Sequence, residues 1–214
     1  MSELLQFDTA NFQGFCEILA KKDKDLRQII RAHGYPTPWI RPNTFQTLVL
    51  TILEQQVSLA AAYAAFNRLK NKIGLVTPVK ILALSDQELR DCYFTRQKIT
   101  YARGLAEAVQ SKKIRLKKME ELPNEIVREQ LIQLKGIGNW TIDVYLMHAL
   151  RRTDLFPLGD IALVNSLKHI KKLNPEISKE KMLQMAEPWR PYRTIAAMIL
   201  WHDYLKRRGT KIQN

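Results

Sequence analysis

The sequence contains very little cysteine and histidine. It has two cysteines, Cys16 and Cys92, and four histidines in 214 residues. Two thiols cannot form a zinc or iron–sulfur site with four cysteine ligands, and no H-x-E or C-x-x-C spacing points to a metal-dependent nuclease or deaminase. Both cysteines lie in apolar helical patterns, so we expect buried, free thiols.

The sequence also lacks a long apolar run. The longest, residues 59–66, is mostly alanine and is far shorter than the roughly 20 residues that span a bilayer. No signal-peptide pattern follows Met1. We therefore expect an intracellular protein without a membrane partner, located in the cytoplasm and nucleoid or in the nucleus.

Acidic residues are scarce relative to basic ones. The chain has 34 Lys and Arg against 21 Asp and Glu, which gives a net charge of +13. Any single basic cluster, such as residues 112–118, is more typical of a solvated helix face. The total charge nevertheless favours a partner rich in phosphate over an acidic membrane surface, and duplex DNA is the natural one. We expect the protein to bind DNA as a monomer.

Alternating strand patterns are absent, and helical patterns occur throughout. Ser85 begins a capping-box pattern, and Thr77 precedes a proline at a first helical position. Asn43 is a candidate N-cap before an apolar stripe that starts at Phe45. The sequence therefore predicts an all-α protein, and its 46% apolar composition is sufficient for a substantial core.

Two glycines one residue apart define the most informative motif. Gly136 and Gly138 predict a tight turn whose backbone can approach a ligand, because glycine tolerates positive φ and has no Cβ. Pro123 occupies a first helical position before the turn, and a second helical stripe begins near Asn139. The segment is predicted to be a helix-hairpin-helix, with the N-terminal N–H groups of its second helix facing a phosphate. A helix corner with C-cap glycines is the simpler alternative.

Asp160 follows the hairpin by a short connection and is the candidate catalytic carboxylate. Because it stands directly before an apolar helical stripe that begins at Ile161, it is also a good N-cap. The two roles are compatible, since a capped carboxylate has a fixed orientation. Asp143 and Asp154 are alternative carboxylates, but their positions are more typical of surface groups.

Four blocks of the sequence resemble a known family. They are residues 52–58, residues 93–102, the hairpin through Asp160, and residues 189–197 with Trp201. Together they are similar to the HhH-GPD superfamily of DNA glycosylases, and within it to the AlkA-like 3-methyladenine DNA glycosylase II family. The similarity covers most of the chain from about Arg41.

The resemblance implies two helical lobes with an active-site cleft between them. The central lobe would comprise residues 41–150 and end in the helix-hairpin-helix. Residues 1–40 together with 151–214 would form the second lobe, which carries the catalytic Asp. Larger bacterial members of the family have an additional N-terminal β-domain, for which this chain has no room, so we expect the compact form.

The resemblance also implies excision of alkylated purines in base excision repair. Breaking the glycosidic bond leaves positive charge on the sugar, which the carboxylate of Asp160 would stabilise. Family members with lyase activity use a lysine where this chain has Trp140, and an indole cannot form a Schiff base. We therefore expect monofunctional hydrolysis without a required cofactor, fastest on 3-methyladenine and slower, if present at all, on 7-methylguanine.

Further site residues follow from the resemblance. Trp140, Tyr145 and Trp201 are the expected walls of a substrate pocket, where an aromatic face attracts a cationic base. Gln56 is expected to fill the gap that a flipped nucleotide leaves. An alkali cation, Na⁺ or K⁺, is expected at the hairpin. The expected DNA contacts are Gln56, Ser58, Lys135, Gly136, Gly138, Asn139 and Thr141, and the expected cation ligands are the backbone carbonyls of Ile132, Leu134 and Ile137.

Two other functions fit parts of the sequence. A non-catalytic helix-hairpin-helix DNA-binding module would share the charge and the hairpin but would need neither Asp160 nor a pocket. A bifunctional glycosylase/lyase for oxidised bases would need an amine nucleophile, which Trp140 does not supply. Release of a free base from DNA, with or without strand cleavage, separates the three functions.

Overall fold

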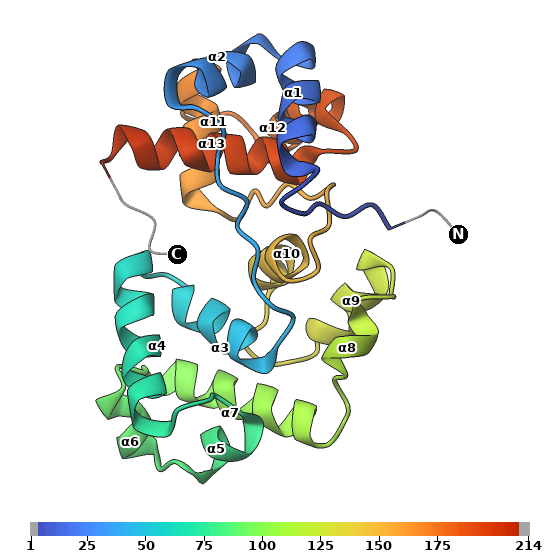
Figure 1. Ribbon diagram of the computed structural model, residues 1–214. Helices are drawn as coiled ribbons and strands as arrows, with labels where there is room; N and C mark the ends of the chain where they lie inside the picture. Colours follow the sequence, from blue (N-terminus) through green and yellow to red (C-terminus); the bar gives the residue numbers. More distant parts are fainter. Residues whose placement is uncertain (1–3, 210–214) are drawn as a thin grey trace. The chain divides into compact units, whose positions relative to one another are not determined.

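The computed structural model describes residues 4–209, and within them the protein is all-α, as predicted. No β-strand occurs in this part of the chain, although Gln6 and Arg152 form an isolated antiparallel bridge. The helices, shown in Figure 1, are α1 (Phe12–Lys22), α2 (Lys24–His33), α3 (Phe45–Glu54), α4 (Leu59–Ile73), α5 (Pro78–Ala83), α6 (Asp86–Asp91), α7 (Arg96–Gln110), α8 (Leu116–Met119), α9 (Asn124–Leu131), α10 (Asn139–His148), α11 (Ile161–Ile170), α12 (Lys179–Ala186), the 3₁₀ helix η1 (Glu187–Trp189) and α13 (Arg193–Arg207).

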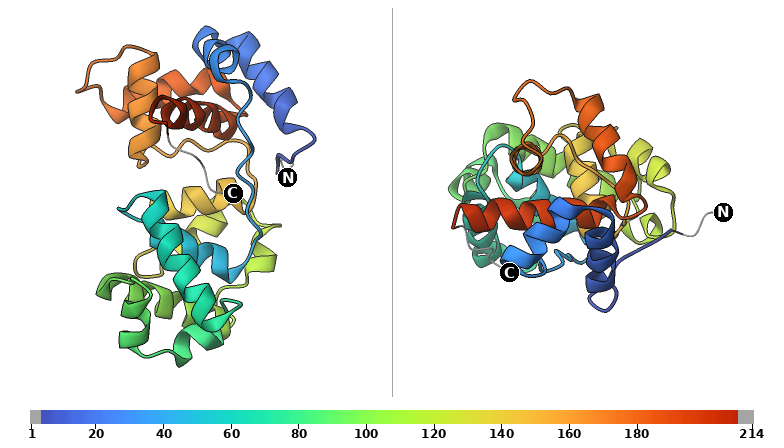
Figure 2. Two further views of the ribbon diagram at one scale, coloured as in Figure 1. Left: turned by 60° about the vertical axis from the view of Figure 1, so that its left-hand side comes forward. Right: turned by 90° about the horizontal axis from the view of Figure 1, so that it is seen from above.

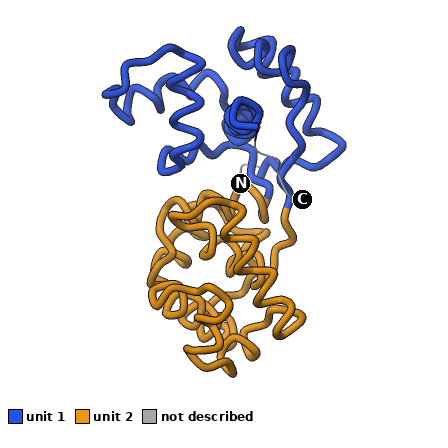
Figure 3. The backbone as a smooth tube through the Cα atoms, turned by 90° about the vertical axis from the view of Figure 1, so that its left-hand side faces the viewer, with its two compact units in different colours: residues 1–40, 151–214 blue, residues 41–150 orange. Residues whose placement is uncertain are grey.

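The chain divides into two compact units, which Figure 3 distinguishes by colour. Unit 1 comprises residues 1–40 and 151–214 and contains α1, α2, α11, α12, η1 and α13. Unit 2 comprises residues 41–150 and contains α3 to α10. Unit 1 is therefore built from both ends of the chain, and unit 2 from one continuous segment.

The core of unit 2 is organised around α3. Every residue of this helix except Gln46 is buried. A helix that is apolar on nearly all sides packs in an interior, and α3 contacts α4, α7 and α10 (Figures 1 and 2). This central position fixes the C-terminal end of α3, from which Gln55 and Gln56 continue.

The core of unit 1 is organised around α13. Its residues from Thr194 to Trp201 are all buried, and α1, α2 and α11 pack against it (Figure 2). At its first turn, the Thr194 N–H donates to the Thr153 carbonyl (2.8 Å), and the Leu155 N–H donates to Thr194 Oγ1 (3.0 Å). The helix thereby holds the segment that leads to Asp160.

The helix caps agree in part with the sequence predictions. Ser85 forms the predicted capping box at α6, and Thr77 caps α5 with a proline at its first position. The prediction that Asn43 caps α3 is wrong, because the N-cap of that helix is Thr44. The side chain of Asn43 instead donates to the Leu116 carbonyl (2.8 Å). A hydrogen bond to a distant part of the chain has replaced the local one.

Both cysteines are buried and free, as predicted. Burial raises the pKa of the Cys16 thiol to about 12 and also raises the pKa of Cys92, so neither thiol is a reactive thiolate at neutral pH. Among residues 4–209, no group of three or more His, Cys, Asp or Glu could hold a metal ion. No helix in the same range has the length and apolar character needed to cross a membrane.

Candidate functional site

The predicted helix-hairpin-helix is present in unit 2. Helix α9 ends at Leu131, and α10 begins at Asn139 with Gly138 as its N-cap. The turn between them is closed by two backbone bonds, from the Leu134 N–H to the Leu131 carbonyl and from the Ile137 N–H to the Leu134 carbonyl (both 3.0 Å). The start of α9 differs by one residue from the prediction, since Pro123 is its N-cap and not its first helical residue.

The two glycines of the turn have different environments. Gly136 has φ +85°, and a Cβ built on it would lie 2.1 Å from the ring of Tyr101. Gly138 has φ −95° and would place a Cβ in open space. The prediction that positive φ is needed was therefore right for Gly136 and wrong for Gly138. Nothing within unit 2 requires glycine at position 138, so the open space there is available to an approaching ligand.

Gln55 connects the end of α3 to the hairpin. Its Nε2 donates to the Gly136 carbonyl (2.8 Å) and to Thr141 Oγ1 (2.9 Å). Thr141 is only 2% exposed, so its hydroxyl is engaged inside the unit. A DNA contact by Thr141, which the sequence analysis expected, stays a prediction. Sequence reasoning did not identify Gln55, because its two partners lie more than 80 residues further along the chain.

Arg128 of α9 holds the first turn of α10. Its Nη1 donates to Asn139 Oδ1 (2.9 Å), and its Nη2 pairs with Asp143. Burial raises the pKa of Asp143, and the Arg128 guanidinium only partly opposes this effect. Asp143 is thus a largely buried ion-pair partner and not the surface group that its sequence position indicated. Asn139 and Lys135 are exposed, and both lie beside the N-terminal end of α10.

Gln56 has an unusual backbone conformation, and the end of α3 just before it is firmly held. Its φ is +58°, a left-handed conformation that is uncommon for a residue with a side chain, and it is exposed. The preceding Glu54 is buried and forms a two-bond pair with Arg41. The Lys98 Nζ donates to the Leu53 carbonyl (2.7 Å) at the end of α3. Strained residues that persist on a rigid support are concentrated at functional positions.

Ser58 caps the next helix. Its Oγ accepts from the Ala61 N–H (3.2 Å) at the start of α4. The residue is exposed, so a DNA contact by the same side chain stays a prediction.

Asp160 is the N-cap of α11 in unit 1. Its Oδ1 accepts from the Leu163 N–H (2.9 Å) and from the Trp201 Nε1–H (2.9 Å). The Asp160 N–H donates to the Pro157 carbonyl (2.9 Å). The side chain is partly exposed, and the following Ile161 is 75% exposed. A carboxylate oriented by two hydrogen bonds at a solvent-accessible helix end is suited to stabilising a positive charge.

Trp201 lies on α13 and is only 4% exposed. Its ring stacks on Trp39, with the ring centroids 5.3 Å apart and the planes 18° from parallel. Trp39 was not identified from the sequence, because it precedes α13 by more than 150 residues and belongs to no motif. The structure thus joins Trp39, Trp201 and Asp160 into one connected group within unit 1.

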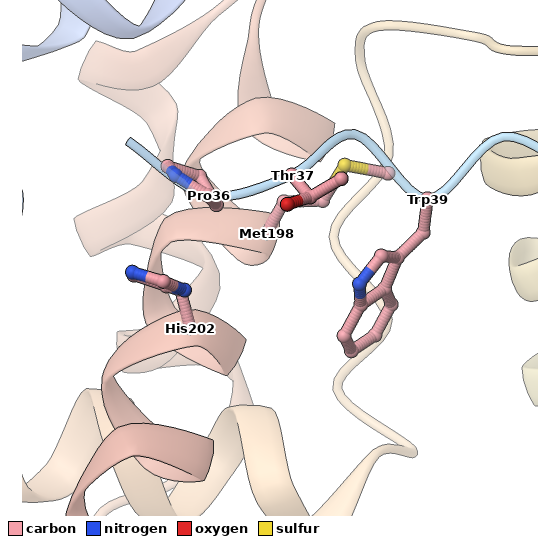
Figure 4. Close-up of a pocket in the computed structure, with 5 residues that line it drawn as sticks. All are labelled: Pro36, Thr37, Trp39, Met198 and His202. Atoms are coloured by element: carbon pink, nitrogen blue, oxygen red, sulfur yellow. The ribbon is translucent and has the colours of Figure 1, made fainter. Parts of the chain in front are cut away.

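A small pocket lies beside this group. Figure 4 shows Pro36, Thr37 and Trp39 on one extended segment, facing Met198 and His202 of α13. The His202 ring is within hydrogen-bond distance of the His33 carbonyl (Nε2 to O, 3.1 Å), and burial lowers the pKa of His202. The imidazole is therefore neutral at physiological pH.

The other two expected pocket residues lie on α10. Tyr145 is fully buried, and its hydroxyl donates to Asn43 Oδ1 (2.6 Å) inside unit 2. We therefore correct its assignment from pocket wall to core residue. Trp140, in the first turn of α10, is partly exposed, so its ring retains surface for a ligand.

Asp154, the second alternative carboxylate, fastens the segment that leads to Asp160. It pairs with Arg190 and with Arg193 (2.6 and 2.7 Å). Arg193 also donates to the Asp154 carbonyl (3.2 Å). Two guanidinium groups neutralise this carboxylate, which makes it a structural anchor.

Comparisons with known proteins show which family the chain resembles. Residues 49–191 match the family described as HhH-GPD superfamily base excision DNA repair protein. DNA-3-methyladenine glycosylase 1 of Schizosaccharomyces pombe is 32% identical over 200 residues, which are 88% of this chain and 88% of that protein. The Bacillus subtilis protein YfjP is 30% identical over 186 residues, which are 83% of this chain but 65% of YfjP.

A solved structure is similar over nearly the same range. It is the 3-methyladenine DNA glycosylase of Schizosaccharomyces pombe in complex with abasic DNA. The TM-score is 0.81 at 30% sequence identity, and the match covers 88% of this chain and 95% of that one. The similarity therefore extends to the fold as well as to the sequence.

Proposed function

The chain belongs to the HhH-GPD superfamily of base excision DNA repair proteins, and we propose that it is a monofunctional DNA glycosylase for alkylated purines. The observation that carries the proposal is the carboxylate of Asp160, which is partly exposed and fixed by the Leu163 N–H and the Trp201 indole. The names of its relatives support the substrate class, since the Schizosaccharomyces pombe protein is named DNA-3-methyladenine glycosylase 1. Because its proposed substrate is DNA, we expect the protein in the cytoplasm and nucleoid or in the nucleus.

DNA binding is assigned to the hairpin of unit 2. The N–H groups at the start of α10 lack partners within the helix, and the helix dipole favours an anion there. Gly138 leaves open space at this end, and Lys135 and Asn139 are exposed beside it. A backbone phosphate fits these three features. The net charge of +13 adds attraction that does not depend on base sequence.

Asp160 supplies the chemistry. As the bond between sugar C1′ and the base nitrogen breaks, the electron pair leaves with the base, and the sugar becomes positively charged. The carboxylate stabilises this charge through space. Water then adds to C1′ and loses a proton, which gives a free base and an abasic site. The hydrogen bonds on Oδ1 hold the carboxylate in place before the reaction, so little reorganisation is needed.

Trp140 is assigned to base recognition. A purine methylated at N3 or N7 is cationic, which weakens its glycosidic bond and attracts it to an aromatic face. The partly exposed indole offers such a face. We expect rapid excision of 3-methyladenine, slower excision of 7-methylguanine and little action on 8-oxoguanine, whose bond is not activated in this way.

Gln56 is assigned to filling the gap in the duplex. Flipping a nucleotide costs a few kcal/mol of stacking and pairing, which an inserted side chain partly restores. The exposed Gln56 has a left-handed backbone conformation. The pair of Arg41 with Glu54 holds the end of α3, two residues before it. Ser58, exposed at the start of α4, is assigned to the same DNA contact.

An alkali cation fits the turn of the hairpin. The carbonyl oxygens of Ile132, Leu134 and Ile137 are neutral oxygen ligands of the kind that K⁺ accepts from backbone. The Leu134 carbonyl accepts one hydrogen bond, from Ile137, and a carbonyl oxygen has two lone pairs. When bound, Na⁺ or K⁺ would add positive charge close to the phosphate.

We predict that the enzyme leaves an intact abasic site. Lyase activity requires an amine nucleophile, and the matching hairpin position is Trp140, which has none. Treatment with borohydride during turnover should therefore trap no covalent protein–DNA adduct. A trapped adduct that maps to a lysine of the hairpin would show that the enzyme is bifunctional.

The decisive experiment for the proposed function is base release. The purified protein is incubated with methylated duplex DNA, and the released bases are identified by chromatography. We expect free 3-methyladenine and no strand cleavage. Tight DNA binding without any released base would instead identify a non-catalytic DNA-binding module.

A further inference from the structure

The Asp160 carboxylate is held by a side chain from a different helix. The Leu163 N–H that bonds Oδ1 belongs to the same helix start as Asp160, as in any N-cap. The second bond comes from Trp201 on α13, 41 residues away, with Nε1 and Oδ1 2.9 Å apart. An indole nitrogen is a donor only, so Oδ1 is the acceptor and its direction is set by the position of the indole.

The indole itself is rigidly placed. Trp201 is 4% exposed and stacks on Trp39. The same helix, α13, holds the segment before Asp160 through Thr194 and through the pair of Arg193 with Asp154. The segment is therefore attached to α13 near its first turn, and the carboxylate is attached two turns later.

From this geometry we propose that Trp201 is the positioning residue of the Asp160 carboxylate. Its Nε1–H fixes the direction of the carboxylate, and the stacked Trp39 keeps the indole in place. The inference rests on the proposed function, in which Asp160 stabilises the charged sugar. It assigns Trp201 to the catalytic step, whereas a pocket wall would act on substrate binding.

Unit 1 contains a second tryptophan that bonds an N-cap carboxylate, and this pair serves as a control. Trp189 is 1% exposed, and its Nε1 donates to Asp23 Oδ2 (3.0 Å). Asp23 is the N-cap of α2, where its Oδ1 accepts from the Asp25 and Leu26 N–H groups. The two tryptophans thus make the same kind of bond to an N-cap carboxylate, but only one of these carboxylates is assigned to catalysis.

The test compares Trp201→Phe with Trp189→Phe. Each change removes one indole N–H and keeps an aromatic ring. Rates of base release are measured at saturating and at limiting concentrations of DNA that contains 3-methyladenine. Trp201→Phe should lower kcat by about 10- to 100-fold with KM nearly unchanged, because a misdirected catalytic group affects the chemical step. Trp189→Phe should leave kcat within about twofold.

The split between kcat and KM provides a readout that a purely structural role would not produce. A misdirected carboxylate slows the chemical step and leaves substrate binding intact, so kcat should fall in Trp201→Phe without a matching rise in KM. Neither constant should change in Trp189→Phe. If Trp201→Phe does not fold, 3-benzothienylalanine at position 201 replaces the N–H by sulfur with nearly the same shape and should give the same result.

The outcomes separate the inference from the proposed function. Asp160→Asn with a normal rate, or a wild-type protein without base release, would overturn both. An inactive Asp160→Asn together with a Trp201 variant of normal kcat and normal KM would overturn the inference alone. A raised KM with normal kcat would return Trp201 to the role of a pocket wall.

Discussion

At the scale of residues, the two hairpin glycines show how one motif serves two purposes. Gly136 has a left-handed backbone in contact with the Tyr101 ring, so the packing of unit 2 requires it. Gly138 has an ordinary backbone and open space around it, so the packing does not. The second glycine is therefore explained by what approaches from outside, and we assign that role to a DNA phosphate.

We predict opposite effects for alanine at these two positions. Gly136→Ala should destabilise the protein by about 2–4 kcal/mol, because it adds backbone strain and a clash with Tyr101. Gly138→Ala should change stability by less than about 0.5 kcal/mol and weaken DNA binding about tenfold, or about 1.4 kcal/mol. Urea denaturation and binding to a duplex with an abasic site measure the two effects.

The two glycine substitutions also serve as controls for each other. If Gly138→Ala folds normally and binds DNA with unchanged affinity, the N-terminal end of α10 is not the phosphate site. If it instead unfolds like Gly136→Ala, the second glycine has a structural role that the geometry does not show.

At the scale of elements, the hairpin is attached to the end of α3. Gln55 bonds the Gly136 carbonyl and the Thr141 hydroxyl, and Gln56 follows it directly. The side-chain amide of Gln55 thus links two parts of the proposed DNA-binding surface. These are Gln56, which is assigned to the gap in the duplex, and the hairpin turn, which is assigned to the phosphate. Both assignments belong to unit 2, so this connection operates within a single compact body.

Replacing Gln55 by Leu should loosen this attachment. The Gly136 carbonyl and the Thr141 hydroxyl would lose a partner in a partly buried place, which costs about 1–3 kcal/mol. We expect a lower melting temperature and weaker DNA binding. Gln110→Leu, at the exposed end of α7, is the matched control and should change neither. Equal DNA affinity for Gln55→Leu and wild type would contradict the proposed role of the connection.

Local signals account for what the sequence predicted correctly. The capping box at Ser85, the cap at Asp160 and the turn at Gly136 depend on residues within a few positions of one another. The all-α class follows from the repeated apolar stripes. These features are set by backbone geometry and short-range hydrogen bonds, which a sequence pattern describes well.

Contacts between distant segments account for what it missed. Gln55, Trp39 and the contact of Tyr101 with Gly136 join segments from 35 to more than 150 residues apart. Tyr145 was misassigned because α10 is buried on nearly all sides, from Thr141 to His148 with the exception of Asp143. A helix without a polar face gives no pattern that separates core positions from positions in a pocket.

At the scale of the whole molecule, the assigned functions are divided between the two units. The hairpin and Gln56 belong to unit 2, and Asp160 with Trp201 and Trp39 belongs to unit 1. In this account, unit 2 binds and opens the duplex, and unit 1 supplies the charge that breaks the glycosidic bond. The two activities should therefore be separable by mutation, since no residue is assigned to both.

The rate of base release by Asp160→Asn tests the central claim most directly. Asn is as good an N-cap as Asp, so the melting temperature and the affinity for DNA should stay close to those of the wild type. The single-turnover rate of 3-methyladenine release should fall by about 10²- to 10³-fold or more, because the charge that stabilises the sugar is gone. A folded Asp160→Asn protein that binds DNA normally and releases the base at nearly the wild-type rate would contradict the account.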